Sequence, residues 1–349
     1  MTIKEVSGPA GAPWQRPLSG HLEALVVESE VLADNPLGDS VRRPLYVYRA
    51  PGVKDEPVPT VYVIQGFTGQ LDMWLRRDAF EPTVIERLDR LFEDEATPRG
   101  IVVFVDAWTS LGGSQFVNSI ATGRYLDYLC DELVPFVDSR YPTLAGAQHR
   151  GIAGKSSGGY GAMTVPMRRP GTFGALASHA GDALFEVSYL PEFRDVARTL
   201  RDHFDGSYEV FFKRLSAADH FDFGLFGVAL EMYAYAAAYS PDPDRPGKVL
   251  LPFDPATGRV IDDVWARWLE HDPVRMIPDH TEALGSLRRI YLDAGRRDEA
   301  YLDLGAQAVS AQLSAHGIDH TLELFEGRHG GIAWRYPIAV RELLIALGT

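Results

Sequence analysis

The chain of 349 residues is 46% hydrophobic and 23% charged, which is the ordinary composition of a globular protein with a large core. Its formal net charge of −14 argues against nucleic acid or an anionic membrane surface as a partner, since both carry negative charge themselves. The single cysteine, Cys130, excludes an intrachain disulfide, and the sequence shows neither an apolar run of ~18 residues nor a signal-peptide segment, so a cytoplasmic location is expected.

Apolar runs alternate along the chain with amphipathic stretches. Residues 1–22 are rich in Gly and Pro and are expected to form a loose N-terminal arm. The segments with strand character are 23–28, 44–48, 60–65, 100–106, 149–155, 174–179, 289–292 and 321–325. Helical patterns cover 83–95, 124–141 and a stretch that ends near 317. We expect two antiparallel edge strands followed by a mostly parallel sheet with helices on both faces, an α/β fold.

The alternation is interrupted once, between the strand that ends at 179 and the strand that begins at 289. This interval is far longer than an ordinary connection and is rich in Phe and Tyr. We interpret 183–285 as an inserted, mostly helical cap on a core made of 23–182 and 286–349. Most of its aromatic residues should form the core of the cap, and a few would line an apolar acyl or aryl pocket.

The sequence G-K-S-S-G at 154–158 follows an apolar run and precedes a helix start made of small residues. Strand, G-x-S-x-G, then helix is the arrangement of a nucleophile elbow, in which Ser156 stands on a sharp turn at a helix N-terminus. The same residues also resemble the end of a phosphate-binding loop. That loop needs a glycine five residues before the Gly-Lys pair, and His149 occupies this position, so the sequence favours the nucleophile.

A serine nucleophile needs a base and an acid, and both follow in the order known for α/β-hydrolases. His329 lies just beyond the last predicted strand and is the candidate base. His149 and His179 are its nearest competitors, but His179 precedes the acids in the chain and would break this order. The candidate acids near the end of the strand at 289–292 are Asp293, Asp298 and Glu299, and Asp182 is a further candidate.

Five segments together resemble the putative-esterase branch of the α/β-hydrolases, which includes esterase D (S-formylglutathione hydrolase), enterochelin esterases, feruloyl esterases and mycolyltransferases. They are IQGFTG at 64–69, YLCDELVP at 128–135, GKSSGGYGA at 154–162, GRRDE at 295–299 and GRHGGIAW at 327–334. The resemblance runs from about residue 23 to the C-terminus and implies an α/β-hydrolase fold with Asp298 as the acid. Members of this branch often carry His or Leu before the nucleophile and Met after it, whereas this chain has Lys155 and Ser157.

The oxyanion hole of such an enzyme consists of two backbone N–H groups. One would come from Ser157, and the resemblance points to Phe67 for the other. Further residues that we expect at the substrate are Gln65, Thr68 and Trp74 at the entrance, Ser114, Gln115 and Asn118 in a following loop, and His179 at a strand end. Ordinary turn chemistry is an equal alternative for the loop at 112–119.

The predicted function is that of a serine hydrolase that cleaves a small-molecule carboxylic ester or thioester through an acyl-enzyme on Ser156. Acyl transfer to an alcohol by the same triad is the alternative among enzymes, and a non-catalytic binding protein on a hydrolase scaffold is the alternative outside them. The sequence contains no metal-binding motif, and no metal or organic cofactor is implied. Its oligomeric state stays open, with a homo-oligomer among the alternatives.

Overall fold

The computed structural model describes residues 16–245 and 247–348, and its centre is an eight-stranded sheet. The strand order is β1-β2-β4-β3-β9-β10-β11-β12. β1 and β2 pair antiparallel, β2 also runs antiparallel to β4, and all pairs from β4 onward are parallel. The bounds are His21–Glu28 (β1), Arg42–Arg49 (β2), Thr60–Ile64 (β3), Ile101–Val105 (β4), Arg150–Lys155 (β9), Ala175–His179 (β10), Arg289–Gly295 (β11) and Thr321–Phe325 (β12). The predicted α/β class with a mostly parallel sheet is confirmed.

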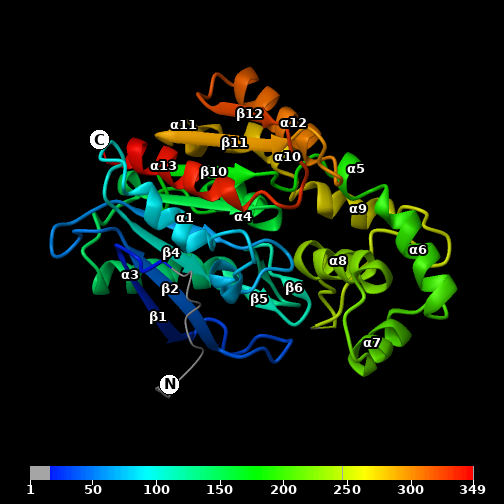
Figure 1. Cartoon of the computed structure of the whole chain (residues 1–349). Coiled ribbons are helices and arrows are strands. Elements are labelled where there is room, and N and C mark those ends of the chain that lie inside the picture. The colour runs from blue at the N-terminus through cyan, green and yellow to red at the C-terminus, as the bar shows by residue number, and fades with distance from the viewer. Residues whose placement is uncertain (1–15, 246, 349) are drawn as a thin grey trace, which may run out of the picture.

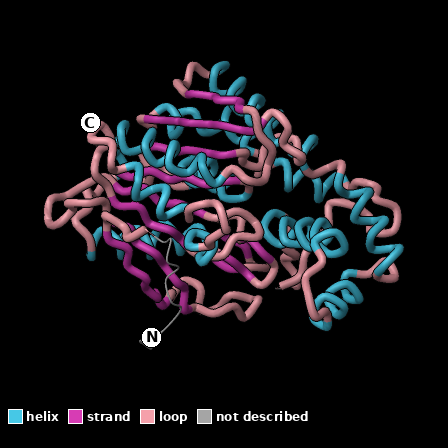
Figure 2. The backbone as a smooth tube through the Cα atoms, viewed as in Figure 1, coloured by secondary structure: helices cyan, strands magenta, loops and turns pink. Residues whose placement is uncertain are grey.

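Helices cover the sheet on both faces (Figures 1 and 2). In the view of Figure 1, α1 (Val84–Leu91) and α13 (Tyr336–Leu347) lie in front of the strands. Val61 and Val63 of β3 pack with these two helices, whereas Tyr62 and Ile64 pack with the helices of the other face. Those helices are α3 (Val134–Arg140), α4 (Ser157–Arg168) and α12 (Leu302–Ala315). The central strands are therefore apolar on both sides, as their continuous Val and Ile runs indicate.

The helical pattern predicted at 124–141 forms three consecutive segments in the structure. They are α2 (Tyr125–Asp127), a π-helical stretch η2 (Tyr128–Leu133) and α3. Cys130 lies buried in this stretch as a free thiol, and burial raises its pKa to about 12. The thiol stays protonated at neutral pH, in agreement with a packing role for this side chain.

The predicted N-terminal arm falls largely outside the described residues, and its described end is attached to the core. The backbone N–H groups of Ser19 and Gly20 donate to the carboxylate of Asp89, at 3.0 and 2.8 Å. β1 then begins at His21, which is earlier than the predicted boundary at residue 22. Residues 19–22 are therefore not loose, because Asp89 of α1 holds the N–H groups of Ser19 and Gly20 and the next two residues belong to β1.

Between β10 and β11 the chain forms a helical lobe on one side of the sheet (Figure 1). It contains α5 (Phe185–Ser188), α6 (Glu192–His203), α7 (Tyr208–Ala217), α8 (Phe223–Tyr239) and α9 (Asp262–Leu269). Aromatic side chains of the lobe such as Phe193, Phe211 and Trp268 form a buried cluster that also includes Phe67 and Tyr160 of the core. The segments that follow are α10 (Pro273–Met276), η4 (Ile277–His280) and α11 (Thr281–Gly285), and they pack against α4 and α12 of the core. The predicted insertion at 183–285 thus has two parts, of which only the first forms the lobe.

Candidate active site

Ser156 stands at the turn between β9 and α4, in a backbone conformation that is rare for a residue with a side chain. Its φ is 57° and its ψ is −125°. The turn requires close approach, because a Cβ added at Gly158 would lie only 2.6 Å from the carbonyl oxygen of Ile64. The N–H of Ser156 donates to the carbonyl of His179 at 3.0 Å, which fixes the turn to β10. This geometry is that of a nucleophile elbow.

His329 and Asp298 extend from Ser156 in a line of hydrogen bonds. Ser156 Oγ lies 3.2 Å from His329 Nε2, and His329 Nδ1 lies 2.8 Å from Asp298 Oδ2. The Asp298 side chain is fully buried, whereas that of His329 is 24% exposed. The base can therefore reach both the nucleophile and the solvent, while the acid beneath it is shielded from water. The structure brings together the three residues that the sequence analysis singled out for the triad.

Glu299 has a different position from its neighbour Asp298. Its carboxylate accepts a hydrogen bond from the backbone N–H of His329 at 2.7 Å and pairs with Arg328. The hydrogen bond from His329 lowers the pKa of Glu299. Asp298 Oδ1 accepts from the N–H of Ala300 at 2.9 Å, so its other oxygen is left for the imidazole. Glu299 thus holds the backbone of the histidine loop, and Asp298 holds the ring.

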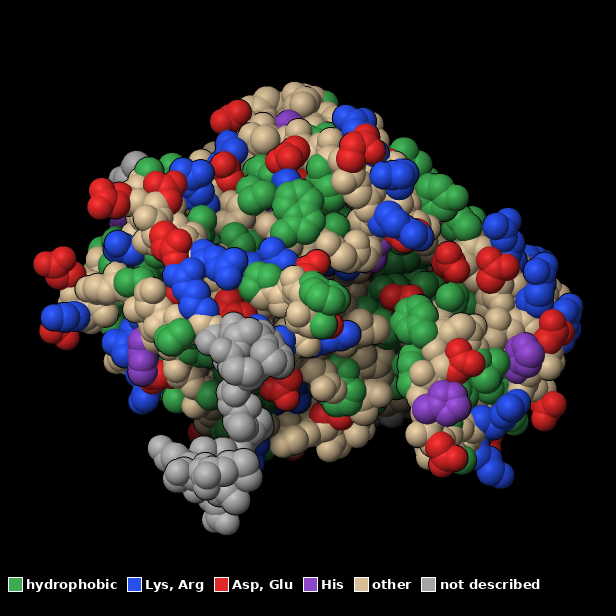
Figure 3. All heavy atoms as spheres, in the orientation of Figure 1, with side chains coloured by type: hydrophobic (Ala, Val, Ile, Leu, Met, Phe, Trp, Pro, Cys, Tyr) green, Lys and Arg blue, Asp and Glu red, His purple; other side chains and the backbone are tan. Residues whose placement is uncertain are grey.

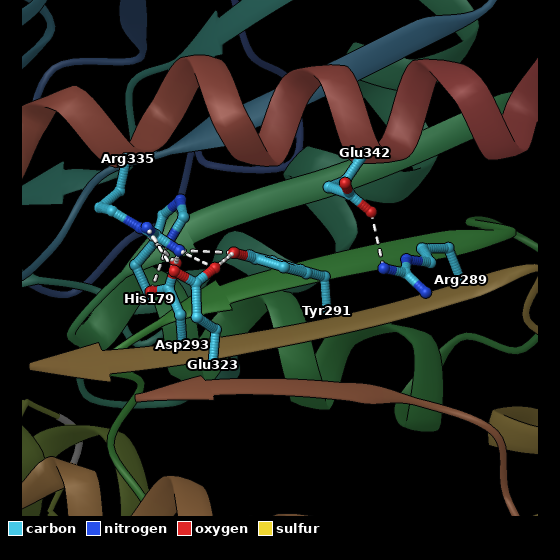
Figure 4. A network of polar contacts seen from close by, with 7 residues as sticks. All are labelled: His179, Arg289, Tyr291, Asp293, Glu323, Arg335 and Glu342. Carbon is cyan, nitrogen blue, oxygen red and sulfur yellow. Dashed lines mark hydrogen bonds and ion pairs between the residues drawn. The ribbon is translucent and has the colours of Figure 1, made fainter. Parts of the chain in front are cut away.

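Asp293, the other acid candidate on β11, belongs to a separate buried network (Figure 4). His179 Nδ1 lies 2.7 Å from Asp293 Oδ1, and Arg335 Nε donates to Asp293 Oδ2 at 2.8 Å. Arg335 also donates to Glu323 of β12 at 2.7 and 3.0 Å. Because Arg335 follows His329 closely in the chain, this network attaches the histidine loop to the ends of β10, β11 and β12. We infer that Asp293 is a positioning residue.

The N–H groups expected for the oxyanion hole border the nucleophile. The loop after β3 passes close to it, since a Cβ added at Gly66 would lie 3.4 Å from Ser156 Cβ. Phe67 follows in this loop, and Ser157 follows the nucleophile as the first residue of α4. Neither backbone N–H donates to any residue in the described part of the chain. Both groups are therefore free to receive an oxyanion beside Ser156 Oγ.

A cavity of about 340 Å³ opens onto Ser156 and His329. Its walls come from the loop after β3, from η1 (Leu71–Leu75), from the elbow and from α8 of the lobe. The lining residues are Gly66, Phe67, Thr68, Gly69, Met73, Arg76, Lys155, Ser156, Phe223, Glu231, His329 and Tyr336. In Figure 3 a hollow separates the lobe from the core on the face shown. A larger depression of about 650 Å³ beside α9 and α10 is lined by no serine, threonine or cysteine.

Two ionisable side chains of this cavity have altered proton affinities. Burial lowers the pKa of Lys155, and burial together with the charge of Asp182 raises the pKa of Glu231 to about 7. The hydroxyl of Tyr235 donates to Glu231 at 3.2 Å. A site this close to a nucleophile therefore contains a carboxyl group that changes charge near neutral pH.

Among the residues predicted at the substrate, Thr68 lines the cavity, and three others lie beside it in the core. The Gln65 amide bonds the loop after β4, where its oxygen accepts from the N–H groups of Ala107 at 2.8 Å and Trp108 at 3.0 Å. Trp74 is fully buried, with its ring 4.9 Å from that of Tyr336. His179 is also fully buried against Asp293. The prediction that Gln65, Trp74 and His179 contact substrate is not supported, because each side chain is used inside the core.

The loop at 112–119 behaves mostly as a structural turn. Ser114 is buried, and its hydroxyl accepts from the N–H of Phe116 at 3.3 Å. Asn118 lies at another surface depression, and its side-chain oxygen accepts from the N–H of Asp127 at 3.2 Å. Neither residue lines the cavity at Ser156, so these two predictions are corrected as well. The turn alternative describes both residues.

Gln115 differs from its neighbours because it joins a buried polar cluster behind the nucleophile. Its amide donates to Tyr239 at 2.9 Å and to Asp182 at 3.3 Å. Asp182 also accepts from the hydroxyls of Tyr189 at 2.8 Å and Ser157 at 3.2 Å. Burial raises the pKa of Asp182. Tyr189 of the lobe thus reaches Ser157 through Asp182, and Gln115 does not line the cavity at Ser156.

Sequence reasoning did not identify Met73, Arg76, Phe223, Glu231 or Tyr336 as lining residues. Phe223 and Glu231 lie on α8, more than sixty positions from the nucleophile, and only the fold brings them to it. The one available signal was the aromatic density of the insertion. Within residues 16–245 and 247–348, no group of three or more His, Cys, Asp or Glu side chains is placed to bind a metal ion. No helix in this part of the chain is long and apolar enough to cross a membrane.

A mostly parallel sheet with a serine at a strand-to-helix turn, an acid after the next-to-last strand and a histidine after the last defines an α/β-hydrolase. The chain belongs to the putative esterase family, whose model matches residues 41–342.

Solved structures with the same fold include a ferulic acid esterase and the S-formylglutathione hydrolase of Agrobacterium tumefaciens. The first is 16% identical, with a TM-score of 0.58 over 94% of this chain and 100% of its own. The second is also 16% identical, with a TM-score of 0.58 over 96% of this chain and 98% of its own. A curated relative, S-formylglutathione hydrolase of Mus musculus, is 23% identical over 142 residues. That match spans 38% of this chain and half of the length of the mouse protein.

Proposed function

We propose that the protein is a serine hydrolase that cleaves a carboxylic ester or thioester of a small molecule through an acyl-enzyme. The observation that carries the proposal is the line from Ser156 to His329 to Asp298, with contacts of 3.2 and 2.8 Å, beside two free N–H groups. A packing serine would need neither a base nor an anion site. Membership of the putative esterase family supports the same reaction.

In this mechanism His329 Nε2 takes the proton of Ser156 as the hydroxyl attacks the carbonyl carbon. The N–H groups of Phe67 and Ser157 stabilise the oxyanion of the tetrahedral intermediate. Asp298 fixes the tautomer of the imidazole and stabilises the imidazolium. The protonated His329 then gives its proton to the leaving alcohol or thiol. A water molecule, activated by His329, hydrolyses the acyl-enzyme and restores Ser156.

We propose that the lobe at 185–269 acts as the cap that selects substrates, since α8 contributes Phe223 and Glu231 to the cavity. It also touches the catalytic machinery, because the ring of Phe67 packs edge-on against Tyr235 with centroids 5.6 Å apart. We further propose a cytoplasmic location, for which the buried free thiol of Cys130 fits a reducing compartment.

The proposal is tested with the Ser156→Ala variant and a fluorophosphonate probe. The variant should fold like the wild type, lose turnover of nitrophenyl esters by about 10⁴-fold or more and resist labelling. Ser157→Ala is the matched control, because it removes the adjacent hydroxyl but keeps the backbone N–H and should still be labelled. Substantial ester turnover by folded Ser156→Ala would refute the nucleophile. Product analysis with added alcohols separates hydrolysis from acyl transfer.

A further inference from the structure

The cavity at Ser156 contains a lysine whose charge is not used inside the protein. Lys155 lines this cavity, precedes the nucleophile in the chain and is half-buried. Within the described residues, its ammonium forms no hydrogen bond and no ion pair. An ammonium that faces a cavity without a partner in the protein is available to an anionic ligand.

The acids that surround Lys155 have other roles. The acids with the largest electrostatic effect on it are Asp298, Asp182, Glu299 and Glu231. Asp298 is bonded to His329, and Glu299 is bonded to Arg328 and to the backbone of His329. Asp182 accepts three hydrogen bonds from neutral donors. These acids give Lys155 a favourable environment for its charge, but none lies within 4 Å of its nitrogen.

Glu231 faces the same cavity from α8 and accepts one hydrogen bond from Tyr235. Since burial favours its protonated form, it can donate a hydrogen bond as well as accept one. Arg76 adds a second cation at the exposed rim of the cavity, where its nearest acid is Asp78 at 3.6 Å. The cavity thus offers two cations and one carboxyl group that is readily neutral, in a protein with a net charge of −14.

We propose that the substrate carries a carboxylate in addition to its scissile ester or thioester, and that Lys155 binds this carboxylate beside Ser156. Arg76 lies at the entrance to attract the anion, and protonated Glu231 donates a hydrogen bond to it. The inference rests on the proposed hydrolase function, for which it names the substrate class. Lys155 is a specificity residue, because the triad and the oxyanion hole perform the bond-breaking step without it.

The test compares esters that differ only in a carboxylate and its neutral amide. One pair places the group on the leaving group (4-carboxyphenyl and 4-carbamoylphenyl acetate), and the other places it on the acyl chain (the 4-nitrophenyl monoesters of adipic acid and of adipamic acid). The wild type should prefer the carboxylate in at least one pair by about tenfold in kcat/KM, the usual effect of one charge-assisted hydrogen bond. Lys155→Met should abolish this preference, and Lys155→Arg should retain most of it.

Lys213→Met on the exposed surface of α7 is the matched control, since it removes the same charge away from the cavity. It should leave the ratio of the two kcat/KM values unchanged. A wild type that prefers the amide in both pairs, or a Lys155→Met variant that keeps the preference, would overturn the proposal. Fluorophosphonate labelling of wild-type Ser156 is measured in parallel. Labelling without carboxylate preference refutes only the substrate class, whereas no labelling refutes the hydrolase itself.

Discussion

The Asp298→Asn variant should lose turnover, whereas the Asp293→Asn variant should lose mainly stability. The side chains of both acids are fully buried, and each carboxylate lies within 2.8 Å of a histidine ring nitrogen. Only Asp298 contacts the histidine that reaches Ser156. The sequence alone left both acids as candidates, so this pair of isosteric variants separates catalytic from structural use of a buried carboxylate.

Asp298→Asn keeps an acceptor for the N–H of Ala300 but removes the negative charge beside His329. The imidazole then loses the partner that fixes its tautomer and stabilises its protonated form, and kcat should fall by about 10⁴-fold. Asp293→Asn removes one carboxylate from Arg335, whose guanidinium is also buried. Loss of one partner of a buried pair costs about 3–5 kcal/mol, and Glu323 should reduce this cost because it still binds Arg335.

The assay combines urea unfolding with steady-state kinetics under conditions in which each variant is fully folded. We expect a near-normal unfolding midpoint with almost no turnover for Asp298→Asn. Asp293→Asn should show a lowered midpoint with substantial remaining turnover. Its kcat should fall to some extent, since Arg335 anchors the loop of His329. A larger loss of kcat in folded Asp293→Asn than in Asp298→Asn would refute this assignment of the acid.

Three further outcomes follow from particular contacts. Gly158→Ala should lower kcat/KM by about 10²-fold. A Cβ at this position would lie 2.6 Å from the carbonyl oxygen of Ile64 and would displace the elbow from the loop of the oxyanion hole. Normal kinetics of this variant would contradict the close approach. Between pH 4.5 and about 7 the contribution of Glu231 to the stability of the wild type should fall as pH rises, because the unfolded chain releases the proton of Glu231 there and the folded protein retains it. Glu231→Gln should remove up to about 3 kcal/mol of this dependence in unfolding titrations, and an unchanged pH profile would show that Glu231 ionises normally. Phe223→Ala should reduce the preference for longer acyl chains in a series of nitrophenyl esters. We expect kcat/KM to fall by up to about fourfold for each methylene that loses contact. An unchanged ranking of the esters would exclude Phe223 from the acyl site.

The sequence by itself determined the fold class and indicated the residues that the structure brings together at Ser156. The short apolar runs and their alternation with amphipathic stretches were sufficient to predict the sheet, because parallel strands buried on both faces must be apolar throughout. The chain order of Ser156, Asp298 and His329 was informative because parallel strands place their carboxyl ends at one edge of the sheet. The sequence therefore predicted which loops meet.

The tertiary structure alone decided which side chains at that edge face the cavity. His179 and Trp74 lie near the nucleophile, yet both point into the core under α13. His179 has the same strand parity as Ala175 and Ala177, which pack on that face, and its register partner is Asp293. Composition does not reveal which parity faces which helix, because both faces of this sheet are buried.

The contribution of the lobe was also decided only by the structure. Glu231 and Tyr235 reach the elbow because α8 packs across Phe67, and no local pattern of the sequence carries that contact. Lys155 is a second residue whose role could not be assigned from the sequence alone. The sequence shows a lysine next to the nucleophile, but only its position in the cavity and the lack of a carboxylate within 4 Å of its nitrogen identified its charge as available to a ligand. The sequence gives the type of each side chain and its neighbours in the chain. The exposure of a side chain and its contacts depend on segments that are far apart in the chain.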